Sequence, residues 1–178
     1  AVGHKNGAEH SEKLLLQADQ PSIGLAVAWD LRIIHRLLPE FVDLATCPQD
    51  PEWHPEGDVW THTLMVVDEA RKRIDGLARG AATAMMLGAM CHDLGKPLTT
   101  AEREGHVRSP GHEAAGVPMA MSVLDRLNVH TMDGFDVRRA VLGLVADSYA
   151  LDNSPNPAEE GNRVLVRMDL NRSGEMER

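Results

Sequence analysis

The residues best suited to chemistry are His92 and Asp93, which follow a run of apolar residues, together with His62, thirty positions earlier. Residues 84–91 are apolar on every side, so the helix that they form should be buried. A buried carboxylate is costly unless a cation or hydrogen bonds compensate for its charge. Gly95 is expected to end this helix as a left-handed cap. We therefore predict a helix that ends in the interior, with His92 and Asp93 placed to hold a metal ion.

The remaining ligands of such an ion must come from other helices. Adjacent residues point about 100° apart around a helix, so His92 and Asp93 can share one ion only at the helix end. His62 is one candidate, and Asp147, near the end of its own helix, is a candidate for the far side. Imidazole and carboxylate ligands suit Ni, Mn, Co, Fe or Zn, with Mg left open. An open coordination position would hold water.

Two further residues could bind an anion beside this ion. Lys96 can serve as a point charge for a phosphate, or it is a solvated lysine at a helix end. His112 lies in the first turn of a helix expected to be capped by Ser109, with Pro110 at its first position. Because helix N-termini favour anions, His112 could hold a phosphate or a second metal, or it is an exposed loop histidine. His106 has a weaker claim.

A purely structural role is the alternative for these side chains. His92 would then form a hydrogen bond in the core, and Asp93 would cap a neighbouring element. Residues 53–58, however, place one aromatic and three titratable groups in a proline-containing loop just before His62, which is unusual for a connector.

Helical periodicity is common along the chain, and no segment shows convincing strand alternation. Residues 46–57 and 95–109 are expected to be loops. The predicted helices are 23–45 with an interruption at Pro39, Asp58 to Ile74 with Asp58 as its cap, 79–94, 109–128, a helix beginning at Asp133, and a last one through Val164, Leu165 and Met168. Six helices joined by loops predict an all-α bundle.

Composition restricts the class of protein further. The net charge of −9 argues against a surface that attracts nucleic acid as a whole, so no DNA-specific binding is expected. Two cysteines outside any CxxC pattern favour a reduced, cytoplasmic protein. No apolar stretch reaches membrane-spanning length. We expect a flexible segment over residues 1–22 and a single domain over residues 23–178.

Three segments carry a resemblance to a known family. Residues 51–64 read Pro-Glu-Trp-His-Pro-Glu-Gly-Asp-Val-Trp-Thr-His-Thr-Leu, residues 91–99 read Cys-His-Asp-Leu-Gly-Lys-Pro-Leu-Thr, and residues 111–117 read Gly-His-Glu-Ala-Ala-Gly-Val. This pattern resembles the HD region of bacterial tRNA nucleotidyltransferases, the CCA-adding enzymes, within the HD superfamily of metal-dependent phosphohydrolases. The resemblance covers about residues 37–147.

The resemblance implies an all-α HD fold, with phosphatase and phosphodiesterase activity on 2′-phosphates and 2′,3′-cyclic phosphates that depends on divalent metals. His62, His92 and Asp93 match the metal-binding positions, and Asp147 is the ligand-competent residue of the last block. The chain shows no Gly-Gly nucleotidyltransferase motif with paired aspartates, so CCA addition is not expected.

These observations predict an HD-type phosphohydrolase that acts on nucleotide or RNA-end phosphates. The metal would be held by His62, His92, Asp93 and Asp147. Lys96 and His112 would bind the phosphate, and Asp93 would also orient or deprotonate the attacking water. The alternatives are an HD module that binds RNA or nucleotide without catalysis, and a helical interaction domain with a structural metal. A homodimer remains open.

Overall fold

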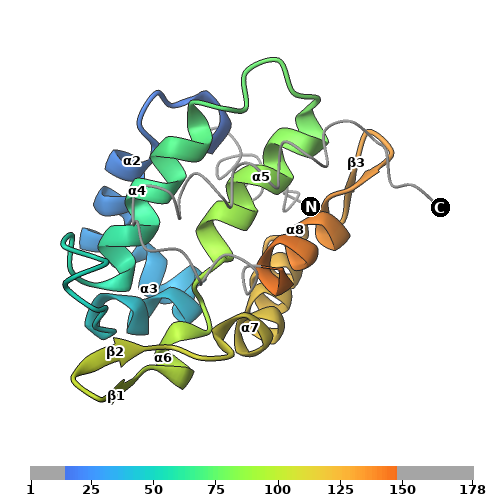
Figure 1. Ribbon diagram of the computed structural model, residues 1–178. Coiled ribbons are helices and arrows are strands. Elements are labelled where there is room, and N and C mark those ends of the chain that lie inside the picture. The colour runs from blue at the N-terminus through green and yellow to red at the C-terminus, as the bar shows by residue number, and fades with distance from the viewer. Residues whose placement is uncertain (1–14, 148–178) are drawn as a thin grey trace.

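The computed structural model describes residues 15–147, which form a bundle of helices with two small antiparallel hairpins (Figure 1). In chain order its elements are α2 (Pro21–Asp30), α3 (Ile33–Leu37), the 3₁₀ helix η1 (Pro39–Thr46), α4 (Val59–Arg71), α5 (Arg79–Cys91), α6 (Lys96–Thr99), β1 (Ala101–Arg103), β2 (His106–Arg108), α7 (His112–Arg126), β3 (Thr131–Met132), β4 (Phe135–Asp136) and α8 (Val137–Ala146). The predicted all-α helical bundle is confirmed. The helix expected through Val164 to Met168 lies outside the described residues.

Helix α5 occupies the centre of the bundle, with α4 packed on one side and α8 on the other (Figure 1). Helix α7 packs on α8, and α2 packs on α4. Nearly all of α5 is buried, from Gly80 to Cys91, and its many small residues let the neighbouring helices approach closely. This confirms the prediction of a buried apolar helix that ends in the interior. No helix of the described part is long and apolar enough to cross a membrane.

Helix α4 begins where its cap was predicted. The backbone of Asp58 is extended, and its Oδ1 atom accepts a hydrogen bond of 2.8 Å from the backbone N–H of Thr61. This satisfies one of the N–H groups that the first turn leaves without a partner. The helix ends at Arg71, shortly before Ile74, although Ile74 is itself buried.

The segment before α4 is more broken than one helix with a single interruption. Pro39 does begin a new element, as predicted, but a second break lies at Arg32, whose φ of 59° is left-handed. The packed region also includes residues before position 23. Leu15 is buried, and the hydroxyl of Ser22 donates a hydrogen bond of 2.6 Å to Asp68.

Two hairpins lie in segments for which the sequence predicted a loop and the start of a helix. Strands β1 and β2 lie inside the expected loop of residues 95–109, and Glu104 and Gly105 between them have φ values of 55° and 81°. Asp133 and Gly134, with φ values of 52° and 83°, connect β3 to β4 at the position where a helix was expected to start. Two positive φ values in a row are the signature of the tight turn that joins antiparallel strands.

Two predicted helix ends also differ from the structure. Gly95 is not a left-handed cap, since its φ is −81°. A Cβ atom there would lie 1.9 Å from the carbonyl oxygen of His112, so glycine is needed for the close approach of two backbones. Helix α7 starts at His112, and the residue before it is the left-handed Gly111 (φ 75°) rather than the expected cap Ser109.

Candidate metal centre and phosphate site

His92 and Asp93 lie at the inner end of α5. His92 is the residue that caps this helix, and its Nδ1 atom lies 2.9 Å from the carbonyl oxygen of Ala89, one turn earlier. Asp93 is only 2% exposed. Its Oδ2 atom lies 3.1 Å from Nε2 of His92, so the two adjacent residues do face each other at the helix end.

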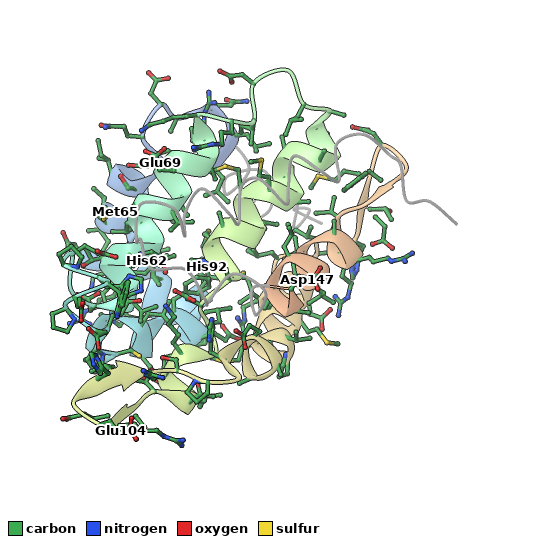
Figure 2. All side chains as sticks on the ribbon, viewed as in Figure 1. His62, Met65, Glu69, His92, Glu104 and Asp147 are labelled. Carbon is green, nitrogen blue, oxygen red and sulfur yellow. The ribbon has the colours of Figure 1, made fainter. Side chains whose placement is uncertain are left out.

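His62 reaches the same carboxylate from the first turn of α4. Its Nδ1 atom lies 2.7 Å from Oε1 of Glu56, and its Nε2 atom lies 4.0 Å from Oδ2 of Asp93. The imidazole rings of His62 and His92 have centroids 5.5 Å apart, and Figure 2 shows how they meet between α4 and the end of α5. His62, His92 and Asp93 offer ligand atoms that all lie within 4.8 Å of one another.

Lys96 approaches Oδ2 of Asp93 from the start of α6. Its Nζ atom lies 3.0 Å from this oxygen and 2.9 Å from Oε1 of Gln49, and its side chain is almost fully buried. A lysine placed this deeply is not the solvated residue of the alternative interpretation. Its positive charge, together with that of a divalent ion, would exceed the negative charges of Asp93 and Glu56, which suits an anion.

His112 faces the other oxygen of the same carboxylate. Its Nε2 atom lies 3.4 Å from Oδ1 of Asp93, and its Nδ1 atom lies 2.7 Å from the carbonyl oxygen of Ser109. The close contact between Gly95 and the first turn of α7 brings His112 to this place. His112 is therefore next to Asp93 but outside the compact group that His62, His92 and Asp93 form.

The hydrogen bonds of the two nearest histidines decide which ring nitrogen carries a proton. A carbonyl oxygen and a carboxylate can only accept, so Nδ1 of His92 and Nδ1 of His62 must donate to Ala89 and Glu56. In the neutral ring, Nε2 then presents a lone pair toward Asp93. Two lone pairs around a carboxylate oxygen are unfavourable unless a cation lies among them.

The Oδ2 atom of Asp93 is also buried without a hydrogen bond of acceptable geometry, although Nζ of Lys96 and Nε2 of His92 are close to it. Such an atom has a cost that a metal ion would remove. Histidines whose second nitrogen is fixed by an oxygen acceptor are typical metal ligands. The donor set therefore fits a divalent metal.

The charges of the site agree with this assignment. Burial by itself would raise the pKa of Asp93, but His92 and Lys96 hold that pKa well below its ordinary value. Burial lowers the pKa of His62, which favours the neutral ring. Burial also acts to lower the pKa of His92, but the adjacent Asp93 more than offsets this and raises it. A proton on His92 therefore compensates Asp93 when no cation does, and metal binding competes with that proton.

Asp147, expected from the sequence as the fourth ligand, is the residue that caps the C-terminal end of α8. It is exposed, and Figure 2 shows it on α8, the helix on the other side of α5 from α4, which carries His62. None of the groups of three close ligand atoms in residues 15–147 includes it. His106, the weaker candidate, donates from Nδ1 to the carboxylate of Asp50 at 3.0 Å and so holds the β1–β2 hairpin to the loop before α4.

Sequence reasoning assigned no role to Gln49 or Glu56, which hold Lys96 and His62. Glu56 was noticed only as part of an unusual loop. Its pKa is lowered to about 2, because hydrogen bonds from His62 and His54 outweigh the effect of burial. A signal for Glu56 existed in the sequence, since a carboxylate six residues before a candidate ligand is a natural partner for its free nitrogen. Nothing in the sequence marked Gln49.

Comparison with known proteins relates this chain to a group that shares one description. It is 39% identical over 115 residues to a Multifunctional CCA protein of Actinobacillus pleuropneumoniae serotype 5b, a match that covers 64% of this chain and 26% of the relative. It is 47% identical over 92 residues to the Multifunctional CCA protein of Halorhodospira halophila, covering 52% and 20% of the two chains. For that of Ralstonia nicotianae the identity is 37% over 146 residues, covering 71% and 32%.

The chain spans about a quarter of the length of the curated relatives that it matches first. No family model matches the chain. No solved structure matches it either. By sequence, this protein is therefore similar to one section of longer proteins described as Multifunctional CCA proteins.

Proposed function

We propose that this chain is a divalent-metal-dependent phosphohydrolase of the HD type. Its substrates are phosphate esters of nucleotides or RNA ends, such as 2′-phosphates and 2′,3′-cyclic phosphates. The observation that supports this best is the meeting of His62, His92 and Lys96 around one oxygen of Asp93 that accepts no well-formed hydrogen bond.

The residues that would hold the metal are His62, His92 and Asp93, with Asp147 kept as the fourth ligand that the resemblance implies. Two imidazole nitrogens favour Ni, Mn, Co, Fe or Zn over Mg, which prefers oxygen ligands. When bound, such a metal polarises a phosphoryl oxygen and lowers the pKa of water, so that a nucleophile exists near neutral pH.

The chain's own side chains supply the remaining parts of a hydrolytic site. Lys96 is buried and held by Gln49, so its ammonium group can bind a phosphate oxygen without first losing a large hydration shell. Because Nδ1 of His112 donates to the carbonyl oxygen of Ser109, Nε2 would donate to a phosphate oxygen beside Asp93 when the ring carries a second proton. Asp93 remains ionised and can orient the attacking water.

The relatives support the same substrate class. They are described as Multifunctional CCA proteins, in agreement with the resemblance of three segments to the HD region of CCA-adding enzymes. As part of this proposal, the protein acts in the cytoplasm on a nucleotide or RNA end, without DNA specificity. A homodimer is compatible with it.

The test is a panel of substrates and metals. The protein is stripped with a chelator, reloaded with Mn, Co, Ni, Zn or Mg, and assayed on nucleoside 2′-phosphates, 2′,3′-cyclic phosphates and an aryl phosphate. We expect metal-dependent release of phosphate from the cyclic or 2′-substrates, and none from His92→Ala. If the metal and a nucleotide bind but nothing is hydrolysed, the chain is a binding module instead. If no metal binds, the proposal is wrong.

A further inference from the structure

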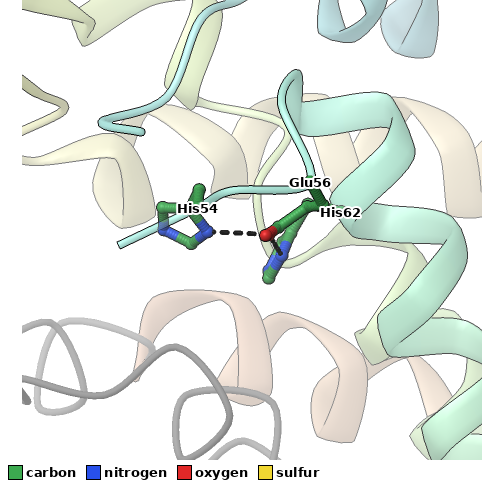
Figure 3. A group of neighbouring side chains, drawn as sticks. All are labelled: His54, Glu56 and His62. Carbon is green, nitrogen blue, oxygen red and sulfur yellow. Dashed lines mark hydrogen bonds and ion pairs between the residues drawn. The ribbon is translucent and has the colours of Figure 1, made fainter. Parts of the chain in front are cut away.

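The loop before α4 contains a carboxylate that receives hydrogen bonds from two imidazoles. Oε1 of Glu56 lies 2.9 Å from Nδ1 of His54 and 2.7 Å from Nδ1 of His62, and Figure 3 shows the two contacts meeting at this oxygen. Both histidines are buried, and the side chain of Glu56 is only 12% exposed. Glu56 therefore connects the candidate metal centre to a residue that lies outside it.

This bond determines how His62 is presented. An ionised carboxylate only accepts, so the proton of a neutral His62 lies on Nδ1, and the lone pair lies on Nε2, 4.0 Å from Oδ2 of Asp93. Without Glu56, the proton of His62 could move to Nε2 and donate toward Asp93. His62 would then lose the lone pair that a metal ion needs.

The three side chains do not form a second metal site, although their ligand atoms lie close together. Both Nδ1 atoms point at the same oxygen of Glu56 as donors, so neither directs a lone pair at a cation there. The group is a chain of hydrogen bonds that ends on a candidate ligand.

The backbone of the loop holds His54 and Glu56 in these positions. The N–H of His54 donates to the carbonyl oxygen of Asp50 at 2.8 Å, and the N–H of Gly57 donates to the carbonyl oxygen of His54 at 3.1 Å. Gly57 has a φ of 108°, which a residue with a side chain rarely adopts. Glu56 is thus set before any metal arrives.

We propose that Glu56 is a positioning residue that makes His62 a metal ligand, and that His54 holds Glu56 in the required orientation. This inference rests on the proposed function, because it assigns Glu56 a role toward the metal of that site. Partners of this kind change metal affinity about 10–100-fold when they are removed.

The experiment compares Glu56→Ala and Glu56→Gln with the unchanged chain. Two readouts are used on chelator-treated protein: the Kd for Zn²⁺ and Mn²⁺ by calorimetry, and the ¹⁵N shifts of the His62 ring, which report the protonated nitrogen. We expect Glu56→Ala to weaken metal binding about 10–100-fold and to move the His62 proton toward Nε2. Glu56→Gln, whose amide oxygen can still accept, should have a smaller effect and remains informative if the alanine variant does not fold.

Glu52→Ala is the matched control, because Glu52 is an exposed carboxylate of the same loop and should leave both readouts unchanged. His54→Ala should change them in the same direction as Glu56→Ala, but less. Metal affinity and ring protonation that stay as in the unchanged chain in both Glu56 variants would overturn the inference, as would an equal loss in Glu52→Ala. The ring shifts test Glu56 even if no phosphate is hydrolysed, whereas missing hydrolysis with tight metal binding contradicts only the proposed function.

Discussion

Single side chains set the chemistry of this site through the direction of their hydrogen bonds. His62 and His92 each direct Nδ1 at an oxygen acceptor, and both therefore turn Nε2 toward Asp93. Residue types and spacing could suggest that these three meet, because the His-Asp pair ends an apolar helix and His62 lies thirty positions earlier, on a neighbouring predicted helix. They could not suggest the partner of Nδ1 of His92, because the carbonyl of Ala89 belongs to a residue with no polar side chain.

Lys96 should matter for turnover much more than for metal binding. Lys96→Ala removes the ammonium group proposed to bind phosphate, so we expect kcat to fall about 100-fold. Metal content, measured by elemental analysis, should remain near that of the unchanged chain, whereas His92→Ala should lose both. Lys72→Ala, at a lysine on the surface paired with Glu69, serves as the control and should change neither.

Variants of His112 and Asp147 distinguish phosphate binding from metal binding. His112 faces Oδ1 rather than the compact ligand group, so His112→Ala should lower phosphate release while leaving metal affinity nearly unchanged. Asp147 is exposed, so Asp147→Asn should weaken metal binding less than His92→Ala does. Metal titrations of the three variants decide this, and a complete loss of metal in His112→Ala would make His112 a ligand.

Among the elements, the contact between the start of α6 and the start of α7 places two site residues at once. A Cβ atom at Gly95 would lie 2.6 Å from the backbone nitrogen of Gly116, in addition to its overlap with His112. Lys96 follows Gly95 directly, so the backbone contact fixes Lys96 and His112 relative to each other. The two anion-binding candidates therefore depend on a position that has no side chain.

Gly95→Ala should be strongly disruptive. Overpacking against backbone atoms cannot be relieved by a rotamer change, so the free energy of unfolding should fall by about 1–3 kcal/mol or more. Gly143→Ala is the control: it lies in α8 with no described atom near its added Cβ, and should be neutral or stabilising by up to about 1 kcal/mol. Urea unfolding of both variants makes the comparison, and equal stabilities would contradict the assigned contact.

An ion pair between η1 and α7 gives the fold a dependence on pH. Nη1 and Nη2 of Arg126 donate to the two carboxylate oxygens of Glu40, at 2.7 Å each. Burial would raise the pKa of Glu40, but Arg126 lowers it below its ordinary value of 4.5. A depressed pKa means that the stabilisation is complete above pH 4.5 and is lost as the pH falls below it.

We therefore expect Glu40→Gln to reduce stability by less than about 1 kcal/mol at pH 7, because Arg126 is partly exposed. The difference from the unchanged chain should shrink as the pH falls below 4.5. Thermal unfolding at several pH values measures it, and a difference that grows on acidification would contradict the pairing.

The elements show which sequence signals suffice. Asp58 and the buried character of α5 were predictable, because a cap and an all-apolar helix are local properties. The turn at Asp133 and Gly134 also carried a local signal, since Asp-Gly is typical of hairpins, but β3 and β4 are too short to show alternation. The prediction of Gly95 as a left-handed cap was wrong. Its neighbour in α7 is distant in sequence, so only the fold shows why glycine is needed there.

For the whole molecule, metal binding should raise the free energy of unfolding. A ligand that binds only the folded state at 100 times its Kd adds about 2.7 kcal/mol, which for a domain of this size corresponds to a rise in Tm of roughly 5–10 °C. Differential scanning calorimetry with and without Zn²⁺ or Mn²⁺ tests this, with Asp93→Asn as the control. A Tm that does not respond to metal would show that the site does not bind a metal ion in solution.

The contact between Gly95 and α7 has a consequence for how this fold can vary. The backbone contact at Gly95 brings Lys96 and His112 together, so the β1–β2 hairpin between them projects as a loop from this contact. The bond from His106 to Asp50 also holds the hairpin. Its tip at Glu104 and Gly105 can be lengthened at a small entropic cost without moving the site. The hairpin tip is thus a position where related chains, or a designer, could insert residues while Lys96 and His112 keep their places.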